Sequence, residues 1–408
     1  MMKQLLFVDD EPNLLDGLKR SFRLMRHEWT MTFATSGAQA LKILEQAPFD
    51  VIVSDMRMPE MDGAQLLTEV QQRYPQIVRI VLSGQSDQDM IYQSIAATHQ
   101  YLAKPCDSEV LKAVVLRACA LRDLLGNDSL RRLVTGMHQI PSQPTLYAEI
   151  NREAESKTSS LKAIGAIISK DLGMTAKILQ LVNSAYFGFF GKASTPEHAV
   201  NLLGLDTVRA LVLTVHAFSQ FSSTQGSHFN IGHLWEASME AGAIARAIAK
   251  AERASTLLID QAYTAGLLHD AGILVLAANV MKQYDAMAKM AHDQGIPLWE
   301  VERQELGVTH ADVGAYLLGL WGLGDPIVEA VAFHHRPSDC VGNTFSPLTA
   351  VHVANVLQEE LACQATGRAP SQIDLVYLDT LHLTDRLPHW REIASTVRQG
   401  EEKERAHG

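Results

Sequence analysis

The sequence predicts a multidomain protein: an α/β domain with a parallel sheet over residues 1–122, then an all-α domain over residues 133–365. Before residue 122, short apolar runs alternate with amphipathic stretches, which is the pattern of repeated strand–helix units. Beyond residue 133, strand-like alternation disappears and apolar residues recur every three or four positions, as on the buried faces of helices. The chain of 408 residues is also longer than one hydrophobic core usually supports, so two or three domains are expected.

Composition narrows the classes to which this protein can belong. Apolar residues make up 47% and charged residues 20% of the chain, as in an ordinary globular protein. The net charge of −11 argues against broad nucleic-acid binding, which depends on clustered Lys and Arg. We find no apolar run of membrane-spanning length, no signal peptide and no CxxC pair among the four cysteines. We therefore expect a cytoplasmic protein with reduced cysteines and no membrane contact.

The apolar runs give the order of elements in residues 1–122. Five runs are predicted to be strands: LLFV before Asp9, TMTFA, VIVS before Asp55, IVRIVL and Tyr101–Ala103. Amphipathic stretches at 14–24, 38–44 and 66–70 are predicted to be the helices between them.

Residues able to do chemistry fall at or just beyond four strand ends: Asp9, Asp10, Asp55, Ser83 and Lys104. In open parallel sheets the functional site lies beyond the carboxyl ends of the strands, so these side chains should meet. A carboxylate attacks phosphate poorly unless a divalent cation offsets the charge of both groups, and Mg²⁺ is held by carboxylates together with phosphate oxygens. The pattern therefore predicts a Mg²⁺-dependent site that accepts phosphate on Asp55.

The segments LLFVDDEPN, FDVIVSDMRMPEMDG, VLSGQ and YLAKP resemble the receiver domain of two-component response regulators, and the resemblance covers residues 1–122. It implies a flavodoxin-like fold with a five-stranded parallel sheet of order 2-1-3-4-5. It also implies that a histidine kinase or phosphotransfer protein phosphorylates Asp55. Mg²⁺ would be bound by Asp9, Asp10, Asp55 and the backbone carbonyl of Arg57.

The same resemblance implies a switch at the end of the sheet. Ser83 matches the hydroxyl that binds the phosphoryl group, Lys104 the lysine that pairs with it, and Tyr101 the aromatic that turns inward when Ser83 moves. Phosphorylation adds about −1.5 to −2 charges and three acceptor oxygens, which would attract Ser83 and Lys104. The alternative for Tyr101 is a strand aromatic packed in the core. We expect a cis Lys104–Pro105 bond, and at Gly63 a tight entry into a helix.

A helical linker is predicted over residues 123–132. Apolar residues recur at helical spacing from Ser108 to Leu125, and Gly126-Asn127-Asp128 then breaks the pattern. This apolar stripe either packs against its own domain or forms a dimerising or signal-carrying helix, because it continues past the expected end of the sheet. A homodimer is therefore one predicted option.

Five separated motifs lie within the predicted helices of residues 133–365: Ile164–Gly188, His198–Leu213, Leu267–Leu276, Glu305–Trp321 and Phe333–Pro337. Together they resemble the HDOD domain, which implies an all-α fold similar to the HD-superfamily phosphohydrolases. We expect Gly204, Gly266 and Gly314 to mark turns or close helix contacts. Residues 366–408 are predicted to form a helical extension, with a helix over Leu387–Val397 and a solvated tail in the final segment EEKERAHG.

The second domain is similar to HD-GYP phosphodiesterases, and this resemblance implies a residual cluster of metal-ligand type: His269, Asp270, His310, His334 and His335. Two further ligand positions are occupied by Ala237, which cannot bind a metal, and Asn355, which lacks the charge of aspartate. No GYP motif follows His335. We therefore expect no catalytic residue and no second metal in this domain, and interpret the cluster as hydrogen-bonded core residues. A single retained metal ion or a bound nucleotide without turnover is the open alternative.

Two functions of different classes remain. In the first, phosphorylation of Asp55 controls a non-catalytic domain that docks another signalling protein. In the second, it gates a metal-dependent phosphohydrolase of the kind that acts on cyclic dinucleotides. The two differ in whether Ala237 and Asn355 abolish the metal site. Direct DNA binding is not expected, because no helix-turn-helix follows the first domain.

Overall fold

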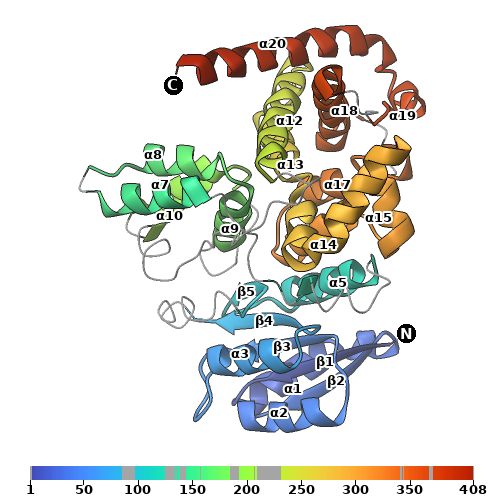
Figure 1. The fold of residues 1–408 in the computed structure, drawn as a ribbon. Coiled ribbons are helices and arrows are strands. Elements are labelled where there is room, and N and C mark those ends of the chain that lie inside the picture. The colour runs from blue at the N-terminus through green and yellow to red at the C-terminus, as the bar shows by residue number, and fades with distance from the viewer. Residues whose placement is uncertain are drawn as a thin grey trace.

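The computed structural model describes residues 2–84, 97–124, 134–135, 137, 144–156, 158–183, 193–205, 207–208, 231–340, 342, 344–366 and 371–407. They form an N-terminal α/β domain and a larger helical part, and helix α5 lies between the sheet and the helical part (Figure 1).

The N-terminal domain is a five-stranded parallel sheet with the order β2-β1-β3-β4-β5, which confirms the expected fold. Its described elements are β1 (Lys3–Val8), α1 (Pro12–Ser21), the 3-10 helix η1 (Arg23–His27), β2 (Trp29–Ala34), α2 (Gly37–Gln46), β3 (Val51–Asp55), α3 (Gly63–Arg73), β4 (Val78–Ser83), β5 (Gln100–Ala103) and α5 (Ser108–Leu124). All five predicted strands and the three predicted helices between the first four of them are therefore present.

Alternation along the strands divides the core of this domain into two layers. Leu5 and Phe7 of β1 pack with the cluster that includes Leu15 of α1 and Val115 of α5. Leu6 and Val8, which point to the opposite face, pack with residues of α2 and α3. Both faces are covered, as the nearly continuous apolar runs of the strands require.

The described residues of the second part form helices and no strands, in agreement with the all-α prediction. The helices are α7 (Pro144–Glu155), α8 (Leu161–Ile168), α9 (Leu172–Asn183), α10 (Pro196–Leu203), α12 (Ile231–Ala251), α13 (Thr256–Leu268), α14 (Ala271–Gln294), α15 (Leu298–Leu306), α16 (His310–Leu320), α17 (Asp325–Phe333), η3 (Pro337–Asp339), α18 (Pro347–Thr366), α19 (Leu375–Thr380), η4 (Thr384–Arg386) and α20 (Leu387–His407). Helices α7, α8 and α10 gather beside the larger bundle (Figure 1).

Glycines allow close contact between the helices of the bundle, as predicted for Gly266. A Cβ on Gly266 would lie 2.8 Å from the Cα of Gly242, where α13 crosses α12. A Cβ on Gly272 would lie 1.9 Å from the carbonyl oxygen of His310, so α14 and α16 touch backbone to backbone. Gly204 instead marks a turn, because it ends α10 with a φ of 79°.

The C-terminal extension crosses the ends of α12 and α18 (Figure 1). Trp390 of α20 is fully buried and donates its indole N–H to Glu252, directly after α12, at 2.8 Å. The predicted helix end at Val397 was wrong, because α20 continues to His407, through most of the segment expected to be a tail. The segment EEKERAH consists mostly of strong helix formers, which accounts for the continuation.

By length and composition alone, the stretch Thr256–Gln294 is apolar enough to cross a membrane. The sequence was expected to contain no apolar run of that length. It comprises α13 and α14, and the His269–Asp270 pair separates these two helices. Its most apolar 18-residue window is 72% buried inside the protein, and core packing accounts for the apolar character.

Candidate functional site

The carboxyl ends of β1 and β3 bring Asp9, Asp10 and Asp55 together, as predicted. One carboxylate oxygen from each residue lies within 4.8 Å of those of the other two. Asp9 and Asp55 are buried, and Asp10 is partly exposed. Three oxygen ligands in this arrangement suit a hard divalent cation such as Mg²⁺.

Lys104, directly after β5, joins this group from the other side. Its Nζ lies 2.8 Å from Asp9 Oδ2 and 2.5 Å from Asp55 Oδ1. Burial raises the pKa of Asp55, and the hydrogen bond and charge of Lys104 only partly oppose it. Burial would lower the pKa of Lys104, but its bonds to Asp55 and Asp9 outweigh this effect and raise it. The ammonium therefore stays charged beside the carboxylates.

The other predicted residues lie along the same edge of the sheet. Ser83 is buried at the end of β4, one residue beyond the Leu82 that pairs with Asp55, and its hydroxyl donates to the carbonyl of Gly84 at 3.3 Å. Tyr101 is 3% exposed and packs in the core between the sheet and helices α2 and α3. Arg57 lies in the loop after β3. The Lys104–Pro105 bond is cis, as expected.

The loop after β3 closes tightly over Asp55. A Cβ on Gly63 would lie 2.2 Å from the carbonyl oxygen of Asp55, so only glycine fits there. Asp62 accepts a hydrogen bond from the backbone N–H of Gln65, and the Gln65 side chain accepts one from the backbone of Asp62. This capping box begins α3 next to Asp55 and confirms the tight helix entry expected at Gly63.

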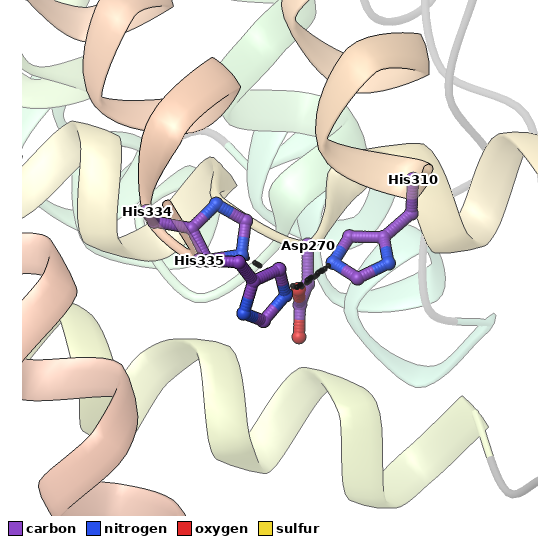
Figure 2. Close-up of side chains that lie close together, drawn as sticks. All are labelled: Asp270, His310, His334 and His335. Carbon is purple, nitrogen blue, oxygen red and sulfur yellow. Dashed lines mark hydrogen bonds and ion pairs between the residues drawn. The ribbon is translucent and has the colours of Figure 1, made fainter. Parts of the chain in front are cut away.

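A second cluster lies where helices of the bundle end. Asp270 follows α13 and precedes α14, His310 is the first residue of α16, and His334 and His335 follow α17. One ligand atom from each lies within 4.8 Å of those of the other three. His310 Nε2 is 3.1 Å from Asp270 Oδ1 and 3.1 Å from His335 Nε2, and His334 Nε2 is 3.8 Å from Asp270 Oδ1. Figure 2 shows the three rings and the carboxylate converging.

Buried acceptors hold the outer nitrogens of two of these rings. Nδ1 of His310 lies 2.7 Å from Oε2 of Glu302, which also accepts the backbone N–H of His310. Nδ1 of His334 lies 2.8 Å from the carbonyl oxygen of Val331. The sequence analysis missed Glu302, because a glutamate eight residues before His310 carries no recognisable signal.

Burial and neighbouring charges shift the pKa values of His310 and His334 in opposite directions. Burial alone would lower the pKa of His310, but the carboxylates of Glu302 and Asp270 outweigh burial and hold it well above its usual value. Burial lowers the pKa of His334 well below its usual value, and the charge of His269 adds to this.

His269, the fifth residue predicted for this cluster, is paired differently. Its Nδ1 lies 2.7 Å from the carbonyl oxygen of Gly266 and its Nε2 lies 3.1 Å from Asn355 Oδ1. It also approaches Asp270 Oδ2 at 3.3 Å. Asn355 thus meets His269, and Ala237 lies on α12. The expected hydrogen-bonded network is therefore present around His269.

Comparison with known proteins assigns both parts of the chain. Residues 5–116 match the response regulator receiver domain family, and residues 140–337 match the HDOD domain family. The chain joins a receiver domain to an HDOD domain. It therefore has the domain composition of a response regulator with an HDOD output domain.

Individual relatives cover parts of the chain. A Treponema pallidum protein is 31% identical over 197 residues, which are 48% of this chain and 38% of its own length. The transcriptional regulatory protein GlrR of Escherichia coli is 39% identical over 111 residues, 26% of this chain and 24% of its own length. The chain thus spans less than half the length of these curated relatives. The structure of the MmoQ response regulator from Methylococcus capsulatus is 21% identical with a TM-score of 0.45, and the match covers 59% of this chain and 97% of that one.

The receiver domain contacts the HDOD domain through the short segment at Thr135. Arg79 of β4 is buried and donates to the carbonyl of Thr135 at 3.1 Å, and Nε2 of His99 lies 2.8 Å from the same oxygen. Burial lowers the pKa of Arg79 to about 9. The hydroxyl of Thr135 is 2.6 Å from that of Tyr316 in α16. A chain of buried polar contacts therefore runs from β4 to α16.

Helix α5 makes a second contact between the domains. Arg117 donates to the carbonyl of Leu323 at 2.5 Å and pairs with Asp325 at 3.1 Å. The apolar stripe of α5 is buried within this chain, for example at Leu111 and Val115. The stripe therefore packs against its own domain, as one of the sequence alternatives predicted, and α5 also contacts α16 of the HDOD domain. The signal-carrying role of α5 and the homodimer stay predictions.

Proposed function

We propose that this protein is a cytoplasmic response regulator in which a histidine kinase or phosphotransfer protein phosphorylates Asp55. The observation that carries the proposal is the convergence of Asp9, Asp10 and Asp55 with the ammonium of Lys104 at the end of the sheet. We further propose that the HDOD domain is a non-catalytic docking surface for another signalling protein.

The receiver residues fit a bound Mg²⁺, because three carboxylate oxygens lie within reach of one cation. When bound, the ion offsets the negative charge of the acceptor and of the incoming phosphoryl group. Asp9 and Asp10 would hold it, together with Asp55 and the carbonyl of Arg57. Lys104 already contacts Asp55 and would pair with a phosphoryl oxygen, and Ser83 would donate its hydroxyl to another.

The contacts between the domains supply a route of control. Ser83 and Lys104 lie at the carboxyl ends of β4 and β5. Arg79 of β4, and His99 directly before β5, contact the helical part of the chain. A phosphoryl group that moves Ser83 and Lys104 would also shift β4 and β5. The contacts of Arg79 and His99 with the Thr135 carbonyl would then change. In this proposal Tyr101, buried in β5, takes part in the shift.

The second candidate function is a phosphorylation-gated phosphohydrolase, and the cluster around Asp270 is the observation that favours it. Against it, His269 faces Asn355, and an amide is a weak ligand for the catalytic metals of such enzymes. Hydrolysis of a cyclic dinucleotide by the purified protein, lost in His310→Gln, would support the enzyme; no hydrolysis would support docking.

Phosphodonor labelling tests the proposed function. Full-length protein incubated with acetyl phosphate and Mg²⁺ should take up about one phosphoryl group per chain. Asp55→Asn and removal of Mg²⁺ by a chelator should each abolish uptake, whereas Asp16→Asn, an exposed change on α1, should leave it intact. Uptake that persists in Asp55→Asn would refute the assignment of the acceptor.

A further inference from the structure

We propose that Asp270, His310, His334 and His335 bind one first-row transition metal ion, with Zn²⁺ or Fe²⁺ as the best fit. Three imidazole nitrogens and one carboxylate oxygen would be its protein ligands. The sequence led to the opposite expectation for the HDOD domain, and the structure supplies the reasons to revise it.

The distances between the ligand atoms suit a single ion. Tetrahedral coordination of zinc at about 2.0–2.1 Å places neighbouring ligand atoms about 3.3 Å apart. The separations from His310 Nε2 to Asp270 Oδ1 and to His335 Nε2 are both 3.1 Å. His334 Nε2 is 3.8 Å from Asp270 Oδ1, so a small rotation of the carboxylate would complete the tetrahedron.

Unsatisfied nitrogen atoms in the cluster provide an independent observation. Nε2 of His334 is fully buried and has no hydrogen-bond partner among the described residues, and neither has Nδ1 of His335. A buried polar atom without a partner costs about 1–3 kcal/mol. Figure 2 shows Nε2 of His334 directed at Asp270. A metal ion there would remove the cost for His334.

The outer contacts of the rings also fit a metal site. The Val331 carbonyl and the Glu302 carboxylate each lie within hydrogen-bond distance of an Nδ1 atom, of His334 and His310 respectively. An N–H at each Nδ1 leaves the Nε2 lone pair directed inward. Metal-binding histidines commonly donate their other N–H to a carboxylate or a backbone carbonyl in this way.

Asn355, one of the two damaged positions, does not belong to this group of four. Asn355 lies against His269 and not against His310, whose neighbours are Glu302, Asp270 and His335. The asparagine at position 355 therefore weakens a neighbouring metal position, of which His269 would be a ligand. The structure thus favours one ion without a second, which makes two-metal hydrolysis unsuitable and a stabilising role suitable.

Such an ion would connect the α13–α14 junction, the start of α16 and the end of α17. Helix α16 also contacts α5 of the receiver, and its Tyr316 bonds to Thr135. The metal would therefore stabilise the helix against which the receiver packs. The side chain of Asp270 is 17% exposed, which gives a route for metal entry.

Metal titration of the full-length chain tests the site. In an Asp9→Asn/Asp10→Asn/Asp55→Asn background, which removes the three receiver carboxylates, chelator-stripped protein should bind about one equivalent of Zn²⁺ by calorimetry. Co²⁺ should give the visible absorption of a tetrahedral site with nitrogen ligands. Zn²⁺ should also raise the melting temperature, because it binds the folded state.

Substitutions then locate the binding. His310→Gln, His334→Gln and Asp270→Asn should each lower Zn²⁺ affinity at least tenfold, whereas His269→Gln should keep the stoichiometry. Circular dichroism shows whether each variant is folded, and so does phosphodonor labelling of the same substitutions made in chains that keep the receiver carboxylates. If the folded background protein binds no Zn²⁺, or if all the variants bind it equally, the proposal is overturned. These outcomes are separate from Asp55 labelling, so either proposal can fail alone.

Discussion

At the residue scale, the receiver site is a balance between burial and charge. Burial disfavours the ionised form of Asp55 and raises its pKa, and the nearby Lys104 ammonium lowers that pKa in part. The same ammonium contacts Asp9, so one side chain connects the proposed acceptor to a carboxylate of the proposed metal site. A change in the charge of Asp55 therefore directly changes its electrostatic interaction with Lys104.

Gly63 fixes the position of Asp55. Because a Cβ would lie 2.2 Å from the Asp55 carbonyl oxygen, Gly63→Ala must displace the backbone of Asp55. We expect at least a tenfold slower uptake of phosphoryl from acetyl phosphate, with the HDOD domain still folded. Gly17→Ala is the control, because its Cβ would meet nothing within 4 Å. Equal rates in the two variants would contradict this role.

Lys177 of α9 should make stability depend on pH. Burial lowers its pKa to about 7 from 10.5, and its Nζ donates to Gln180 at 2.9 Å. Between pH 7 and 10 the unfolded state therefore binds more protons than the folded state, so the free energy of unfolding should rise with pH. The slope from this group is at most about 1.4 kcal/mol per pH unit.

Urea unfolding at pH 6.5, 7.5 and 8.5 measures this effect. Lys177→Met should flatten the rise with pH and should stabilise the protein most at pH 6.5. Lys162→Met, an exposed change on α8, should leave the slope as in the wild type. Parallel curves for the wild type and Lys177→Met would count against the shifted pKa.

At the element scale, helices of the HDOD domain touch through glycines and are covered by the C-terminal extension. Gly272 sets the contact between α14 and α16 that places Asp270 beside His310. Helix α20 covers α12 and α18, beyond the residues matched to the HDOD family. The extension is therefore an integral part of the bundle.

Trp390 tests the contribution of α20. It is fully buried, and its indole N–H donates to the carboxylate of Glu252. The same carboxylate pairs with Arg386. Trp390→Ala should lower the free energy of unfolding by about 3–5 kcal/mol, the usual cost of deleting a buried tryptophan. The neighbouring His389→Ala, with a side chain 50% exposed, should change it by less than about 0.5 kcal/mol. Urea denaturation of both variants gives the comparison.

At the scale of the whole molecule, the two domains share one continuous apolar core. The cluster that contains Leu5 of the sheet and Val115 of α5 also contains Tyr316 of α16. Hydrogen bonds of Thr135 and Arg117 add specific, directional contacts to this apolar packing. The receiver and the output domain are thus coupled by direct packing, in addition to the residues that connect them.

Arg117 tests this coupling. Its bond to the Leu323 carbonyl is partly buried, whereas its partner Asp325 has a side chain 86% exposed. Arg117→Ala should speed amide hydrogen exchange in α16 and near Leu323, because a contact between the domains is lost. Asp325→Ala should have little effect, since exposed ion pairs contribute at most about 1 kcal/mol. Equal exchange in both variants would show that this contact does not hold the domains together.

The sequence by itself determined the receiver fold and the residues of its site. Strand runs and strand-end acids are local patterns, and parallel strands necessarily bring their carboxyl ends to one edge, so Asp9 and Asp55 could be placed together. It also identified the histidines of the HDOD domain, because their motifs are local.

Only the tertiary structure decided how those histidines are paired. Helical periodicity shows which face is buried but not which helix ends meet. The pairing of His269 with Asn355, the support of His310 by Glu302, and the contact of Thr135 with Tyr316 depend on that packing. These contacts join residues up to 181 positions apart, and side-chain packing over such separations leaves no periodic signal in the sequence.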